Sequence, residues 1–86
     1  MEILNKKRTE LLIKLYLNDK KGVVKNFTRL SREFFTEASG RKVLKLFIEK
    51  GFVTTTKKGR ELTINITPLG KKIAKHLNTL YNYLYD

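Results

Sequence analysis

Residues that could perform catalysis are scarce in this chain of 86 amino acids. His76 is the single histidine and cysteine is absent, so a zinc site built from His and Cys ligands and a thiol nucleophile are both excluded. The eight Asp and Glu residues do not occur at the spacing of a metal-binding motif. Ser31 and Ser39 have no base or glycine-rich turn near them in the sequence to activate a nucleophile. The sequence therefore predicts no enzyme, no metal and no cofactor.

Basic side chains, by contrast, are abundant and clustered. Nineteen Lys and Arg oppose eight Asp and Glu, which gives a formal net charge of +11. Residues 36–60 hold seven basic and two acidic groups, whereas residues 61–86 hold three and two and are rich in tyrosine. A basic excess of this size favours a polyanionic partner. Its distribution predicts anion contact in the middle of the chain and burial near the end.

Length and composition indicate one small domain that spans residues 1–86. Hydrophobic residues make up 41% of the chain, which suits a compact small fold and leaves little room for a deep catalytic cleft as well. We predict no small-molecule ligand. The first residues hold an acid and no long apolar run, and no stretch approaches the ~18 apolar residues of a membrane span. We expect a cytoplasmic protein with no membrane partner.

Apolar residues at spacings of three and four predict two helices, over residues 6–18 and 23–35. A third helix is predicted from Thr36, a favourable N-cap residue, to about Lys50. Gly51 then suits the left-handed position that commonly terminates a helix. These three helices lie in the first part of the chain, before any strand pattern.

A β-hairpin is predicted after the third helix. Residues 52–56 are β-branched or aromatic, and residues 62–66 alternate apolar with polar side chains, as half-buried strands do. Lys57-Lys58-Gly59 fits a three-residue loop with glycine in the left-handed position. This loop would set Phe52 opposite Ile64.

A last helix is predicted from the Thr67-Pro68 pair to about Tyr85. Its apolar side chains spread over about 200°, twice the ~100° that one core requires. We therefore predict that residues 67–86 form a dimerisation helix. A competing interpretation is that the wide arc covers the first helix of the same chain. The predicted dimer interface consists of Leu77, Leu80, Tyr81, Leu84 and Tyr85.

The order of helix, helix, basic helix, hairpin and helix resembles the winged helix-turn-helix fold of small MarR-like and PadR-like regulators, such as archaeal or viral ones. Segment 41–53, which contains Glu49-Lys50-Gly51-Phe52-Val53, is similar to their recognition helix and first wing strand. Segment 62–73, which contains Thr67-Pro68-Leu69-Gly70-Lys71, resembles the entry into their last helix. The resemblance implies an α+β fold with three helices, a two-stranded hairpin wing and a C-terminal helix. For a viral source it implies the cytoplasm or nucleoid of the host.

A helix has the width of the DNA major groove, so the third helix is the predicted reader of bases. Arg41 and Lys42 can donate hydrogen bonds to guanine O6 and N7, and small residues beside them would permit close approach. The predicted DNA-binding residues of this helix are Ala38, Ser39, Gly40, Arg41, Lys42 and Lys45. Those of the wing, expected to contact phosphates, are Lys57, Lys58 and Arg60.

These features predict a sequence-specific protein that binds double-stranded DNA and regulates transcription as a homodimer. One alternative is a winged-helix module that binds an acidic protein partner. Another is an architectural protein that binds DNA through charge, with little sequence preference. The three differ in how binding responds to salt and to DNA sequence.

Overall fold

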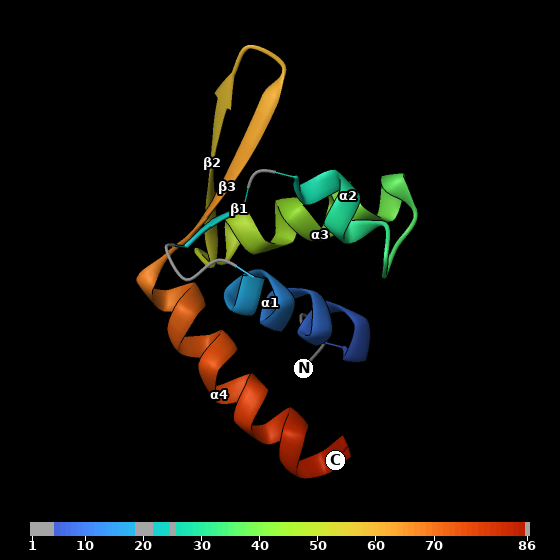
Figure 1. Ribbon diagram of the computed structural model, residues 1–86, viewed down its shortest axis with the longest axis vertical. Helices are drawn as coiled ribbons and strands as arrows, with labels where there is room; N and C mark the ends of the chain where they lie inside the picture. The colour runs from blue at the N-terminus through green and yellow to red at the C-terminus, as the bar shows by residue number, and fades with distance from the viewer. Residues whose placement is uncertain (1–4, 19–21, 25, 86) are drawn as a thin grey trace.

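Two helices from opposite ends of the chain, α1 (Lys6–Asn18) and α4 (Pro68–Tyr85), pack against each other. In this computed structural model they lie on one side of α2 (Phe27–Ser31), α3 (Glu37–Glu49) and a small sheet (Figure 1). The strands are β1 (Val23–Val24), β2 (Val53–Lys58) and β3 (Glu61–Ile66). The structure describes residues 5–18, 22–24 and 26–85, without the side chains of Val24, Lys58, Glu61 and Tyr85.

The first helix begins and ends where its periodicity predicts. Asn5 precedes it, and the Asn5 side-chain oxygen accepts a hydrogen bond from the backbone N–H of Arg8 at 2.9 Å, as an N-cap does. Leu11, Leu12 and Leu15 are completely buried and belong to the central core cluster. The leucine spacing therefore fixes which face of α1 the rest of the domain covers.

The second helix is shorter than predicted, and its assignment over residues 23–35 is wrong in the first part. Val23 and Val24 instead form a strand, antiparallel to β3, in which Val23 lies opposite Asn65. Gly22 precedes this strand with φ of +79°, a conformation that interrupts a helix. The β-branched valines then suit the extended backbone. Helical structure in this segment is confined to α2.

The third helix is confirmed at both ends. The Thr36 hydroxyl oxygen accepts a hydrogen bond from the Ser39 N–H at 3.2 Å, so Thr36 is the N-cap. At the other end Gly51 has φ of +76°, and the Phe52 N–H donates to the carbonyl of Phe47 at 2.9 Å. Local capping chemistry therefore sets the boundaries of α3.

The predicted hairpin is present, but its register is wrong. The strands are joined by a two-residue turn of Gly59 and Arg60, with Lys58 opposite Glu61. Gly59 has φ of +61°, and no described non-glycine residue has a positive φ, a combination that favours a type II′ turn. Ile64 consequently lies opposite Thr55 in β2 and Val24 in β1. The sheet has three strands in the order β1-β3-β2 rather than the two predicted.

Phe52 explains why the register differs. We expected it in the first wing strand, but it lies before β2 and is nearly buried, with its ring centroid 6.0 Å from that of Phe47. Because Phe52 packs in the core beside α3, Val53 at the start of β2 is the one buried residue among the described side chains of this strand. The next four residues of β2 are exposed. The wing can therefore project into solvent, as Figure 1 shows.

The last helix begins as predicted, and its start is joined to the end of α3. The Thr67 hydroxyl oxygen accepts from the Gly70 N–H at 3.0 Å, which confirms Thr67 as the N-cap. The same hydroxyl lies within hydrogen-bonding distance of the carbonyl oxygens of Gly51 and Phe52. The Thr67 N–H also donates to Phe52 O at 3.0 Å. These contacts connect α3, the base of the wing and α4.

Candidate nucleic-acid interface

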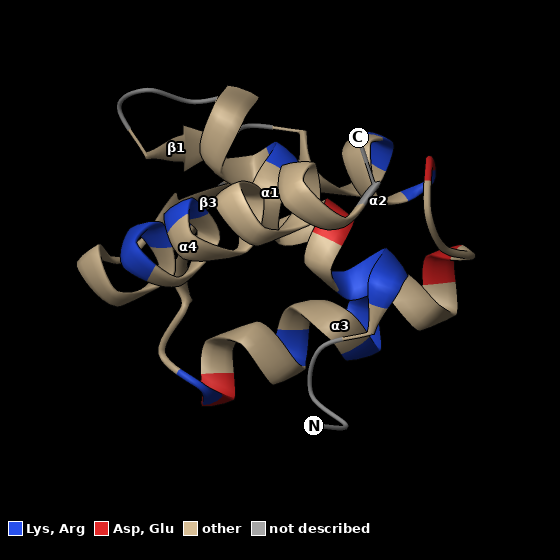
Figure 2. Ribbon diagram, turned by 90° about the horizontal axis from the view of Figure 1, so that it is seen from below, with Lys and Arg blue, Asp and Glu red and all other residues tan. Residues whose placement is uncertain are grey.

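The exposed face of α3 carries five of the six residues predicted for it. Ala38, Ser39, Arg41, Lys42 and Lys45 are all exposed. Figure 2 shows the basic residues recurring along the length of this helix. The opposite face is apolar and enters the core through Val43 and Phe47, both nearly or fully buried. The helix therefore presents a polar, basic side to solvent because most of its apolar side packs in the core, although Ile48 near its end is 41% exposed.

Gly40 is the exception, and its prediction as a DNA-contacting residue is wrong. It is buried, and a Cβ atom built on it would lie 2.9 Å from the hydroxyl oxygen of Ser31 in α2. Ser31 is itself 3% exposed and donates a hydrogen bond to the carbonyl of Thr28 at 3.1 Å. The small residue at position 40 therefore permits close approach of α2 to α3 rather than of DNA.

Arg41 is tied to an acidic neighbour. Its guanidinium donates to the carboxylate of Glu37 at 2.9 Å, one turn earlier on the same face of α3. Both side chains remain largely exposed, at 77% and 53%, so solvent screens the pair and it costs little to break. The sequence contained this signal, because acid and base four residues apart on a helix commonly pair.

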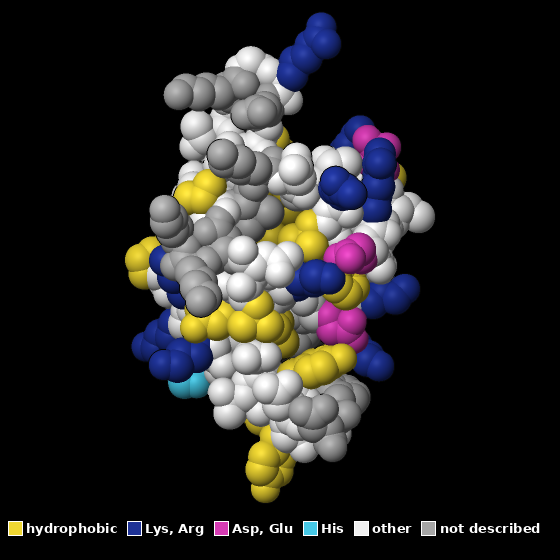
Figure 3. Space-filling view, in the orientation of Figure 1, with side chains coloured by type: hydrophobic (Ala, Val, Ile, Leu, Met, Phe, Trp, Pro, Cys, Tyr) yellow, Lys and Arg dark blue, Asp and Glu magenta, His cyan; other side chains and the backbone are white. Residues whose placement is uncertain are grey.

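The wing adds basic groups at some distance from α3. Lys57 and Arg60 are exposed, as predicted, whereas the side chain of Lys58 lies outside the described part of the chain. Figure 3 shows a basic side chain at the far end of the wing and more of them over α2 and α3. Carboxylates lie among this second group, so the surface is mixed in charge rather than uniformly basic.

Two arginines outside the predicted set join this surface. Arg29 and Arg32 are exposed and line, together with Arg60, a pocket of about 300 Å³ between α2 and the wing. The sequence places Arg29 and Arg32 three residues apart, a spacing that brings them to one side of a helical turn. Nothing in the sequence indicates that this pair lies beside the wing, so we did not predict these two arginines as binding residues.

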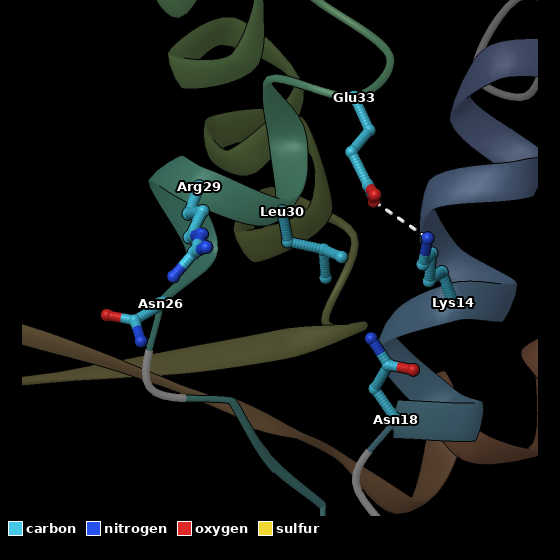
Figure 4. A pocket seen from close by; sticks show the side chains of 6 residues that line it. All are labelled: Lys14, Asn18, Asn26, Arg29, Leu30 and Glu33. Atoms are coloured by element: carbon cyan, nitrogen blue, oxygen red, sulfur yellow. Dashed lines mark ion pairs between the residues drawn. The ribbon is translucent and has the colours of Figure 1, made fainter.

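A second pocket, of about 540 Å³, lies between α1 and α2 (Figure 4). Its walls include Lys14 and Glu33, which form an ion pair at 2.8 Å. The Lys14 ammonium also lies 5.8 Å from the centre of the Phe34 ring. These contacts hold α1 to the turn after α2, so we assign Lys14 a structural role.

The apolar arc of α4 divides into two faces. Ala74 is completely buried, and Leu77 and Tyr81 are partly buried, on the side that packs on α1. The Tyr81 hydroxyl donates to the Glu10 carboxylate at 3.0 Å. The interpretation that α4 covers the first helix is therefore correct for this face, and Leu77 and Tyr81 are largely used within the chain.

The other face of α4 is uncovered. Its large exposed apolar residues include Leu80 at 56%, Tyr83 at 88% and Leu84 at 69%. Leu80 and Leu84 belong to the predicted dimer interface, whereas the side chain of Tyr85 lies outside the described residues. We call the α4 stripe the side chains spaced by four, three, four and three residues along this face: Leu69, Ile73, His76, Leu80 and Tyr83. All are exposed except Ile73, which is partly buried against the core.

Among the described residues, no group of three His, Asp or Glu side chains could hold a metal ion. Within the same part of the chain, no helix combines the length and the apolar composition needed to cross a membrane.

The chain is similar in structure to two solved proteins. It superimposes on AF1382 from Archaeoglobus fulgidus with a TM-score of 0.82 and 23% identity, over 99% of this chain and 96% of that one. It superimposes on F-93 of SSV1 with a TM-score of 0.67 and 24% identity, over 94% and 91% of the two chains. The fold is winged-helix-like. No protein-family model matches the sequence, and no curated protein matches it.

Proposed function

We propose that this protein binds double-stranded DNA sequence-specifically and regulates transcription as a homodimer, in the cytoplasm or nucleoid. The observation that carries the proposal is the exposed basic face of α3 beside a projecting basic wing, in a chain of net charge +11. A winged-helix-like fold by itself implies no function, so the proposal depends on these side chains.

In the proposed complex α3 enters the major groove and its exposed face meets the base edges. Arg41 and Lys42 donate hydrogen bonds to guanine O6 and N7, and Ser39 can donate or accept. To contact a base, Arg41 must break its ion pair with Glu37 or donate to the carboxylate and the base at once. Because this ion pair is exposed and weak, either change costs little free energy. Ala38 and Ser39, small residues in the first turn, let the helix backbone approach the bases.

The wing supplies affinity rather than selectivity. Lys57 and Lys58 belong to a hairpin that projects from the body, where phosphates of the adjacent backbone or the minor groove can be reached. Phosphate contacts position a protein on the duplex and carry no base information. Their contribution falls steeply with salt because each neutralised phosphate releases condensed counterions.

The α4 stripe supports the homodimer. Residues at alternating spacings of four and three form the seam of paired helices, and the stripe follows this spacing from Leu69 to Tyr83, with apolar side chains at every position except His76. Uncovered apolar surface of this extent on so small a domain favours an interface. A two-fold axis along α4 would hold two copies of α3 at a fixed separation, so that each reads one half of a palindromic site.

Selection of bound sequences from a pool of random duplexes tests the proposal. We expect an enriched palindromic motif with half-sites about one helical turn apart, and a preference for it that persists as salt rises. Retention of all duplexes alike, with affinity lost at higher salt, would instead identify an architectural DNA-binding protein. Failure to retain any duplex would favour an acidic protein partner.

A further inference from the structure

Three arginine side chains from two separate elements meet at one pocket. Arg29 belongs to α2, Arg32 follows it directly as the C-cap residue, and Arg60 belongs to the turn of the wing. All three line the pocket of about 300 Å³ that lies between α2 and the wing. Arginines about 30 positions apart in the sequence therefore line the same pocket.

The walls of this pocket contain donors and no described acid. Phe27, which is 4% exposed, and the partly buried Leu62 supply its apolar part, and Asn26 and Thr28 add polar side chains. Asn26 precedes α2 but makes no side-chain capping hydrogen bond, so its amide is available. Arg29 and Asn26 also line the pocket of about 540 Å³ between α1 and α2 that Figure 4 draws, where the Arg29 side chain extends from α2 toward Asn26.

The described charged residues that line the pocket are all positive. Among the side chains that the structure describes, the ion pairs are Lys14 with Glu33 and Arg41 with Glu37, and neither involves Arg29, Arg32 or Arg60. All three side chains are exposed, so solvent weakens their mutual repulsion, and an anion placed between them would be attracted by all three. A phosphate group matches this arrangement, since guanidinium groups donate in a planar fork to its oxygens.

We propose that this pocket binds one backbone phosphate of duplex DNA, shared by Arg29, Arg32 and Arg60. The inference rests on the proposed function. The pocket borders the proposed DNA surface because α2 contacts both α3 and β3. It assigns Arg60 to a site formed jointly with α2, in place of an isolated contact at the wing tip. The occupant is a phosphodiester of the bound strand rather than a free phosphorylated compound.

The number of phosphates is measurable, because the logarithm of affinity falls with the logarithm of salt by about 0.9 for each phosphate neutralised. The test compares the wild-type chain with the triple variant Arg29→Ala/Arg32→Ala/Arg60→Ala on the selected duplex. The triple variant Lys7→Ala/Lys72→Ala/Lys75→Ala removes the same charge from exposed positions on α1 and α4 and is the matched control. Thermal unfolding by circular dichroism checks that all three proteins fold.

If one phosphate is shared, the arginine variant lowers the magnitude of the slope by about 0.9 and the lysine variant leaves it unchanged. A decrease of about 2.7 would mean three separate phosphates, and no decrease would mean three solvated side chains; either result overturns the shared site. Duplexes with one methylphosphonate per half-site give a second readout. We expect one position at which the wild-type chain loses affinity and the arginine variant does not.

Two further outcomes are separable from these. If the wild-type chain binds no duplex at all, the proposed function fails and the phosphate site fails with it. If duplex binds with the same slope in the arginine variant, while inorganic phosphate shifts the arginine side-chain NMR signals of the wild-type chain, the pocket takes a free phosphate and the DNA assignment is wrong.

Discussion

A Cβ atom on Gly70 would lie 2.0 Å from the carbonyl oxygen of Phe52. The first turn of α4 therefore lies so close to the backbone that follows α3 that only glycine fits at position 70. The same carbonyl accepts the Thr67 N–H, so the backbone on both sides is held in place. The glycine in the segment that resembles the last-helix entry of winged-helix regulators thus has a packing explanation in this chain.

Gly70→Ala is expected to destabilise the fold by about 3 kcal/mol or more, because neither backbone can move away. The sign is informative, since glycine to alanine within a helix ordinarily stabilises by roughly 1 kcal/mol. Urea denaturation measures the difference in free energy of unfolding. Lys75→Ala, at an exposed position of the same helix, is the control and should change stability by less than about 0.5 kcal/mol. Equal stability of Gly70→Ala and the wild type would contradict the close approach.

Gly40→Ala tests the contact between α2 and α3. Its Cβ would meet the Ser31 hydroxyl at 2.9 Å, and we expect a loss of about 1–3 kcal/mol. Ser31→Ala removes that oxygen, and the nearest remaining Ser31 atom is then 3.3 Å away. The double variant should therefore lose less than the sum of the two single losses, as a double-mutant cycle would reveal. Strict additivity would show that the two residues do not interact.

Glu37→Gln should strengthen binding to duplex DNA. The substitution frees Arg41 from its carboxylate partner and removes a negative charge from the proposed DNA-facing surface. Stability should fall only slightly, by about 0.3–0.5 kcal/mol for the lost pair. Fluorescence anisotropy with the selected duplex measures the affinity, and Glu49→Gln at the far end of α3 is the matched control. Unchanged affinity in Glu37→Gln would remove Arg41 from the interface.

Arg41→Ala and Lys57→Ala should have different effects on DNA binding. Arg41→Ala is expected to cost about 1–3 kcal/mol and to relax the preference at one base position, as loss of a base contact does. Lys57→Ala should weaken selected and random duplexes alike and lower the salt slope by about one. Binding titrations on both duplexes at several salt concentrations distinguish these patterns. Identical behaviour of the two variants would refute the division between α3 and the wing.

Leu80→Glu should convert the proposed dimer to a monomer. Leu80 is 56% exposed within one chain, so the substitution should leave the fold intact while it places a charge in the α4 stripe. Light scattering should give about 20 kDa for the wild type, twice the chain mass of 10.1 kDa, and about 10 kDa for the variant. Asn82→Glu adds the same charge on the opposite side of α4 and should remain dimeric. A wild-type mass near that of one chain would overturn the dimer.

Elements with their own capping signals could be predicted from the sequence. Thr36 and Gly51 delimit α3, and Thr67 starts α4, because these residues satisfy backbone groups within a few positions along the chain. Tertiary partners determined the features that were missed. The two residues of β1 form a strand only because β3 lies beside them, and so short a segment carries no periodicity of its own.

The same distinction applies to the candidate site. Exposure of Arg41, Lys42 and Lys45 followed from the helical wheel, because the opposite arc of α3 is apolar. Gly40 was misassigned, since nothing in the sequence reveals that Ser31 packs against it. Arg32 was likewise missed, because its proximity to the wing depends on the path of the chain after α2.

The junction of Gly51, Phe52, Thr67 and Gly70 constrains the spacing of the half-sites that the proposed dimer would bind. Because hydrogen bonds and close packing join the end of α3 directly to the start of α4, these two helices have no hinge between them. In a dimer formed along α4, the distance between the two copies of α3 would be fixed by the fold. Inserting one base pair between half-sites moves them about 3.4 Å apart and rotates one relative to the other by roughly a tenth of a turn. A rigid pair of helices cannot follow that displacement, so we expect all sites that the proposed dimer binds to share a single half-site spacing.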